Sequence, residues 1–199
     1  MGRRSSHTAE ELRELILGAS TDLISEGGLS GLSAREVARR IGYSPGTLYN
    51  VFENLDDIVL TIEGRLLDRL ANELDGVPNG GSAEERVLAL ARTYLRFTAA
   101  HPKLWNLLFE HHLPPGRDIP GWYQQKLDGL MSRVADAVTP LLPEHSVEEA
   151  KRAASVLWAG VHGITSLATT DKLSIVTSEG AGLLVDQLVR TYLIGLKHG

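Results

Sequence analysis

A short run of polar residues near the N-terminus carries the side chains that proteins use to contact nucleic acids. Thr47, Tyr49 and Asn50 have hydroxyl and amide groups, and Gly46 allows a close approach of the backbone. Groups of this kind reach base edges and phosphate oxygens. Arg35, earlier in the same segment, adds positive charge. The pattern predicts a surface that binds double-stranded DNA.

The segment that must position these groups is residues 33–52, SAREVARRIGYSPGTLYNVF. It predicts two short helices joined by a tight turn. Ser33 is a suitable N-cap for the first helix, and Gly42 supplies the left-handed position that ends it. Ser44 is a suitable N-cap for the second helix, and Pro45 fits its first position, where no N–H is needed. Ser44 and Pro45 are themselves among the predicted DNA-binding residues.

Two apolar residues fix the predicted angle between these helices. Ala38 is small where the helices cross, and Leu48 fills the gap between them. This arrangement is typical of a helix-turn-helix, whose second helix enters the major groove of DNA. The alternative is a surface helical hairpin with no ligand. The polar residues on the outer side of the second helix favour the DNA-binding interpretation.

The run AREVARRIGYSPGTLYNVFENLDDIV, residues 34–59, resembles the DNA-binding domain of the tetracycline-repressor (TetR) family. The resemblance implies that Arg35, Thr47, Tyr49 and Asn50 contact DNA, with Tyr49 on a phosphate. Leu55 is a departure, because the family commonly has a lysine there that contacts the DNA backbone. One phosphate contact per half-site is therefore in doubt.

The composition bounds the possible functions. The chain has 199 residues, no cysteine and a net charge of −5. Disulfide frameworks and thiolate chemistry are excluded, and the composition suits the cytoplasm. Residues 1–52 carry six basic and six acidic groups, so the negative excess lies beyond them. Arg35, Arg39 and Arg40 are predicted to form a local positive face.

The first six residues, MGRRSS, fit two targeting patterns, an N-myristoylation signal and a twin-arginine export signal. A capped helix follows them, rather than the hydrophobic core that an export signal needs. A basic arm near DNA and a solvated tail are both open interpretations.

Helical periodicity and breaker residues predict an all-α fold in two domains, residues 1–54 and residues 55–199. The resemblance implies that the first is a three-helix DNA-binding domain and the second a helical ligand-binding and dimerisation domain. No apolar run is long enough to span a membrane. The predicted helices outside the helix-turn-helix are residues 8–27, 55–74, 82–101, 103–111, 122–138, 146–170 and 178–196.

The last two predicted helices suggest an interface with a second copy of the chain. Residues 153–168 are apolar nearly all round, and such a helix must be covered on every side. The resemblance implies that these two helices form a four-helix interface in a homodimer. The alternative is that they only close the core of one chain. The candidate interface residues are Gly160, Gly163, Leu184, Leu188 and Tyr192.

Trp158 and His162, four residues apart, share one helix face. They suit an aromatic-walled pocket in which an imidazole bonds a largely apolar ligand, although the pattern favours a packed core histidine. The run WAGVHG from Trp158, and FTAAHPKLWNLLF from Phe97, resemble one subgroup of TetR-like regulators. The other candidate pocket residues are Trp105, Phe109, Trp122, Tyr123 and Met131.

Signals for catalysis, cofactors and metals are weak. No Gly-x-Ser-x-Gly elbow is present. His111 and His112 are adjacent, so on a helix they point about 100° apart and do not easily share one ion. We interpret them as an exposed helix end.

Together these patterns and the resemblance predict a homodimeric, ligand-responsive transcriptional repressor that binds a palindromic operator, although the sequence alone does not separate repressors from activators. Two alternatives remain: a dimeric helical carrier that has lost its DNA role, and an enzyme that uses a pocket around His162.

Overall fold

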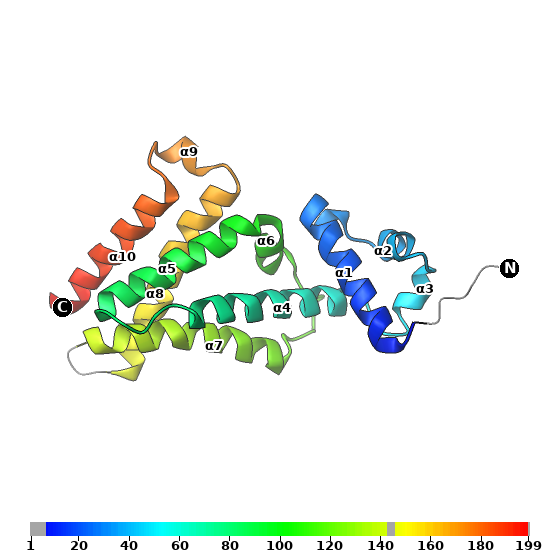
Figure 1. Cartoon of the computed structure of the whole chain (residues 1–199), viewed down its shortest axis with the longest axis horizontal. Helices are drawn as coiled ribbons and strands as arrows, with labels where there is room; N and C mark the ends of the chain where they lie inside the picture. The colour runs from blue at the N-terminus through cyan, green and yellow to red at the C-terminus, as the bar shows by residue number, and fades with distance from the viewer. Residues whose placement is uncertain (1–6, 143–145, 199) are drawn as a thin grey trace. The chain divides into compact units, whose positions relative to one another are not determined.

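The computed structural model describes residues 7–142 and 146–198, and over these residues it is built of α-helices and short 3₁₀ turns, without a strand (Figure 1). The predicted all-α class is confirmed. The helices are α1 (Ala9–Gly27), α2 (Ala34–Ile41), α3 (Pro45–Leu48), α4 (Leu55–Asp75), α5 (Ala83–Ala100), α6 (Pro102–Glu110), α7 (Gly121–Val138), α8 (Val147–Thr169), α9 (Leu173–Val176) and α10 (Ala181–His198).

The contacts divide the chain into two compact units. The first comprises residues up to Leu66 together with Lys103–Ile119, and the second comprises Leu67–Pro102 and Pro120–Gly199. The division runs through the middle of α4, so one continuous helix belongs to both units. The predicted functional boundary at residue 54, the start of this helix, stays a prediction.

Local sequence signals set the helix ends. Thr8 and Ser82 form complete capping boxes with Glu11 and Glu85, in which the hydroxyl and the carboxylate each accept a backbone N–H. Asn54 accepts the backbone N–H of Asp57 at 3.0 Å and so begins α4. The predicted helices therefore start and stop within a few residues of their expected positions. The short helix α9 was not predicted.

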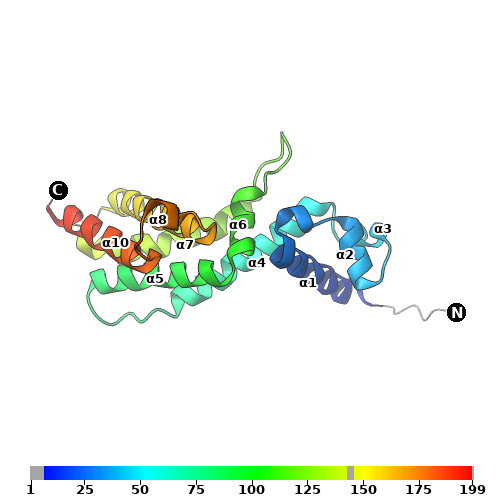
Figure 2. The same cartoon turned by 90° about the horizontal axis from the view of Figure 1, so that it is seen from above.

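In the first unit, α1 packs across α2, and α2 packs on α3, as both views show (Figures 1 and 2). Their shared core is aliphatic and aromatic. It comprises Ile16, Leu17 and Ile24 of α1, Val37 and Ala38 of α2, and Leu48 and Phe52, with Ile58 and Ile62 of α4.

In the second unit, α5, α7, α8 and α10 form a helical bundle (Figure 2). The second half of α4 is tied to α7 by two ion pairs, Lys126 with Asp68, and Arg133 with Asp75 at 2.7 Å. One face of α8 is buried in the bundle through Ala153, Ala154, Leu157 and Val161, with Thr165 one turn further on. The opposite face is exposed.

Candidate nucleic-acid interface

The turn of the helix-turn-helix is built as the sequence predicts. Gly42 ends α2 with φ 75° and ψ 30°, the left-handed conformation that a residue with a Cβ adopts only with strain. Ser33 caps α2 by accepting the backbone N–H of Glu36 at 3.2 Å. Ala38 and Leu48 are fully enclosed, and this packing holds α3 against α2.

The second helix is shorter than predicted. α3 is a single helical turn, and residues 49–51 continue it as hydrogen-bonded turns, with the amides of Val51 and Phe52 bonded to the Leu48 carbonyl. Ser44 occupies the N-cap position, but its hydroxyl lies 3.0 Å from the Thr47 hydroxyl instead of capping a backbone N–H. The side chain of Thr47 is thereby engaged and half-buried.

The other predicted DNA-binding residues lie on the surface. Tyr49 is 49% exposed, and the remaining members of the set are exposed as well: Arg35, Ser44, Pro45, Gly46 and Asn50. The segment therefore presents a phenol, an amide and a guanidinium to solvent. These groups match the chemistry of phosphates and base edges.

The predicted positive face is weaker than expected, because two of its three arginines are engaged in ion pairs. Arg39 donates from Nε to both carboxylate oxygens of Glu36 at 3.1 and 3.0 Å, and it holds the pKa of that carboxyl below its usual range. Arg40 donates to the two oxygens of Glu26 at 3.0 and 2.8 Å. Sequence spacing did not reveal the second pair, whose members are on different helices.

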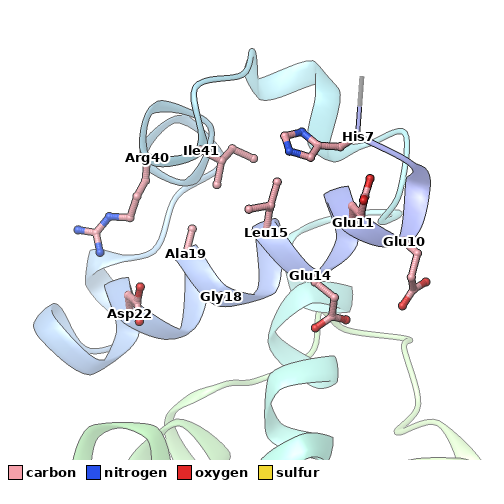
Figure 3. A pocket seen from close by; sticks show the side chains of 10 residues that line it. All are labelled: His7, Glu10, Glu11, Glu14, Leu15, Gly18, Ala19, Asp22, Arg40 and Ile41. Carbon is pink, nitrogen blue, oxygen red and sulfur yellow. The ribbon is translucent and has the colours of Figure 1, made fainter. Parts of the chain in front are cut away.

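A hollow between α1 and α2 shows which side of the unit is unsuited to DNA (Figure 3). Its acidic lining residues outnumber its basic ones, and negative charge of this kind repels phosphates. The lining residues are His7, Glu10, Glu11, Glu14, Leu15, Gly18, Ala19, Asp22, Arg40 and Ile41. At one edge, Nδ1 of His7 lies 2.6 Å from the Tyr43 hydroxyl. The predicted basic arm, Arg3 and Arg4, lies outside the described residues.

In the second unit the structure places Trp158 and His162 together, as their spacing predicts. Their rings are parallel, 6° apart in tilt, with centroids separated by 5.2 Å. Nδ1 of His162 lies 2.8 Å from the hydroxyl of Tyr94 on α5. Burial lowers the pKa of His162, so its imidazole is neutral at pH 7. Tyr94 was missed as a site residue, because its position in the apolar stripe of its helix indicates only that it faces inward.

The remaining candidate pocket residues are dispersed. Tyr123 is buried on α7, with Trp122 exposed beside it, and Met131 is half-buried on the same helix. Trp105 and Phe109 lie on α6, which belongs with the first unit, Trp105 buried and Phe109 exposed. Their role in a ligand pocket stays a prediction.

The candidate dimer residues divide between interior and surface. A Cβ on Gly160 would lie 2.7 Å from a methyl of Leu188, so these two residues meet where α8 crosses α10 within one chain. Gly163 is exposed, and Leu184 and Tyr192 are half-buried. The close approach predicted at Gly160 therefore serves the intrachain crossing.

The interpretation of His111 and His112 as an exposed helix end is wrong for His111. Its side chain is only 7% exposed and lies between two carboxylates of α4, whereas His112 is exposed. Among the residues that the structure describes, no group of three or more His, Asp or Glu side chains is arranged to hold a metal ion.

Comparison with known proteins identifies the family. Residues 16–62 match the model described as "Bacterial regulatory proteins, tetR family", and residues 87–192 match "Tetracyclin repressor-like, C-terminal domain". The chain belongs to the tetracycline-repressor family. It is a transcriptional regulator with a DNA-binding helix-turn-helix, and members of this class are not enzymes. The narrower subgroup predicted from the Trp158 and His162 run stays a prediction.

Individual relatives are distant. An uncharacterized HTH-type transcriptional regulator of Mycobacterium tuberculosis is 24% identical over 180 residues, which cover 89% of this chain and 78% of that protein. A Rhodococcus sp. RHA1 protein of unknown function has a similar solved structure, with a TM-score of 0.75 at 23% identity over 98% of this chain and 97% of that one. FadR of Bacillus subtilis, solved in complex with stearoyl-CoA, has a TM-score of 0.67 at 14% identity over 92% and 98%. These structural likenesses show the fold alone.

No helix in the described ranges, 7–142 and 146–198, is long and apolar enough to cross a membrane.

We predict that Arg35 contributes more to DNA affinity than Arg39, although both are exposed arginines of α2. Arg35→Ala should lower the slope of log affinity against log salt by about one per bound subunit, because one phosphate contact is lost. Arg39→Ala should leave the slope nearly unchanged, because Glu36 already offsets its charge. Fluorescence anisotropy with a duplex at several salt concentrations measures both slopes. Equal slopes for the two variants would contradict this assignment.

Proposed function

We propose that the protein is a homodimeric repressor that binds a palindromic operator and releases it when a largely apolar effector binds. The observation that carries the DNA half is the exposed end of the helix-turn-helix, where Arg35, Tyr49 and Asn50 face solvent beside a rigid turn. Dimers of this motif read two half-sites about one helical turn apart, or a multiple of that distance. A palindrome is the sequence that presents the same half-site to both copies.

The dimer is supported by two exposed stripes on the last long helices. Val156, Ala159, Gly163 and Leu167 follow one another at spacings of three and four on α8, and all are exposed. On α10, exposed residues recur at the same spacings: Leu183, Gln187, Thr191 and Ile194. Small and apolar residues on a surface stripe suit close packing against another helix. We infer that these stripes, rather than the Gly160 crossing, meet the second copy.

The effector proposal rests on the aromatic cluster of the second unit. A neutral His162, held by Tyr94 and stacked on Trp158, combines apolar walls with one polar group that orients a ligand. The stearoyl-CoA complex of Bacillus subtilis FadR is an example of an acyl-chain ligand in a protein of this fold. α4 runs from the second unit into the first, so a shift of its second half reaches the DNA-binding unit. A coupling of about 1–3 kcal/mol would suffice for regulation.

Selection of bound fragments from sheared source DNA tests the operator. We expect one enriched inverted repeat. Asn50→Ala should relax the preference at one or two positions of each half-site, at about 1–3 kcal/mol per lost base contact. Tyr49→Phe should instead weaken all sequences alike, because a phosphate contact carries no sequence information. No enriched repeat from a folded dimer would favour the carrier alternative.

Matched aspartate substitutions test the dimer. Ile194→Asp, at a residue 61% exposed on the α10 stripe, should shift the protein to monomer because an interface would bury the new charge. Val147→Asp, at a residue 64% exposed on α8 and nine positions before Val156, lies on the opposite side of that helix and should leave the dimer intact. Sedimentation velocity distinguishes the two states. A dimeric Ile194→Asp variant would exclude this interface.

Thermal unfolding with stearoyl-CoA and other acyl ligands tests the effector site. A ligand at a hundredfold its Kd should stabilise the protein by about 2.7 kcal/mol, and it should release operator DNA. His162→Ala should lose most of this stabilisation, whereas the exposed His112→Ala should retain it. Equal stabilisation of both variants would place the ligand elsewhere.

A further inference from the structure

His111 joins two carboxylates of α4 within the first unit. Its Nδ1 lies 3.2 Å from Oε1 of Glu63, and its Nε2 lies 3.2 Å from Oδ1 of Asp56. The side chains of His111 and Glu63 are 7% and 3% exposed, and that of Asp56 is 30% exposed. Neither the candidate DNA contacts nor the candidate effector site uses this buried polar cluster.

While both carboxylates are ionised, only a protonated imidazole donates to both neighbours. An imidazolium donates from both ring nitrogens, whereas a neutral imidazole donates from one and presents a lone pair at the other. If His111 were neutral, one carboxylate would face that lone pair. For buried Glu63 the loss of a donor is costly, because a buried carboxylate needs a partner.

The local electrostatics agree with the geometry. The hydrogen bond to Glu63 raises the pKa of His111, burial opposes this, and the bond to Asp56 raises it further. Other charged groups on the same or neighbouring segments are exposed or have partners of their own. They are Glu110 and His112 beside His111, Asp57, which accepts the Glu53 amide, Arg117 with Glu53, and Arg65 of α4 with Glu14 of α1.

The cluster lies where it can influence the DNA-binding end. Asp56 is in the first turn of α4, six positions after Asn50, and Glu63 is two turns further along the same face. His111 directly follows α6. The three side chains therefore tie the end of α6 to the beginning of α4.

We propose that His111, Asp56 and Glu63 form a proton-operated clasp, which is closed while the imidazole is protonated and opens when it loses its proton. The closed clasp fixes the start of α4 and so holds residues 49–54 in the DNA-binding arrangement. The effect on DNA rests on the proposed function, whereas the clasp itself does not.

The direction of the pH dependence follows from linkage. Because the pKa of His111 is raised in the folded protein, the clasp contributes its full stability below the ordinary histidine pKa of about 6.5. This contribution is lost as the pH rises through the higher, folded-state pKa. The clasp is therefore closed at about pH 6 and open at alkaline pH.

Hydrogen exchange of the protein without DNA tests the clasp. After correction for the intrinsic pH dependence of exchange, amides at residues 108–113 and 55–58 should lose protection between about pH 6 and pH 9. The opening equilibrium should change about tenfold for each unit by which the His111 pKa is raised. In Glu63→Gln this change should be much smaller, because the amide N–H₂ can donate to a neutral Nδ1 while Nε2–H donates to Asp56.

Glu110→Gln is the matched control, since it removes the same charge from an exposed position next to His111. It should keep the wild-type pH dependence. If Glu63→Gln fails to fold, an NMR titration of His111 in the wild type and in Asp56→Asn replaces it. The pKa must lie above 6.5 in the wild type and fall in Asp56→Asn. An ordinary or lowered wild-type pKa, or equal pH profiles for Glu63→Gln and the wild type, would overturn the clasp.

DNA affinity at the same two pH values provides the second readout. The wild type and Glu110→Gln should lose more affinity between about pH 6 and pH 9 than Glu63→Gln does. Equal losses, with the exchange results as expected, would overturn the regulatory role and leave the clasp. Absence of DNA binding at every pH would refute the proposed function instead, because the exchange result does not depend on DNA.

Discussion

The DNA-binding unit depends on one steric constraint, the close crossing of α2 and α3. Ala38 and Leu48 are enclosed at this crossing, and Gly42 takes the left-handed conformation that brings the helices together. α3 is a single helical turn, too short to be stable by itself. Its conformation therefore comes from tertiary packing, and the exposed groups of Tyr49 and Asn50 are held in place by the buried residues on either side of them.

α4 imposes the second constraint, because one helix of 21 residues contributes to both units. Its apolar row, Ile58, Ile62, Leu66 and Leu70, is buried along the whole length. Its polar positions are specialised: Asp56 and Glu63 meet His111, and Asp68 and Asp75 meet basic residues of α7. A helix with an uninterrupted hydrogen-bond ladder transmits a rotation or shift more readily than a loop would, which suits a connection between effector and DNA.

Most of the fold could be predicted from the sequence, because its determinants are local. The capping residues Thr8, Asn54 and Ser82 and the turn at Gly42 act within a few positions, and the apolar row of α4 follows helical periodicity. The failures have a common cause in long-range pairing. Nothing near Arg40 in sequence indicates Glu26, and the adjacent histidines read as a solvated helix end because the partners of His111 are about fifty residues away. The identity of the exposed site residues was predictable, whereas their ion pairs and hydrogen bonds were not.

The pairing of the arginines bears on why a regulator of this design would need two copies. Arg39 and Arg40 are engaged with carboxylates of their own unit, so each copy brings little uncompensated positive charge to DNA. A single copy then binds weakly, as electrostatics supplies most non-specific affinity. In the proposed dimer the second copy binds at a high effective concentration, and the two weak affinities combine. This gain depends on the distance between the two DNA-contacting segments, one in each copy. A regulator built from weak units is therefore more sensitive to a small movement of α4 than one built from units that bind strongly alone.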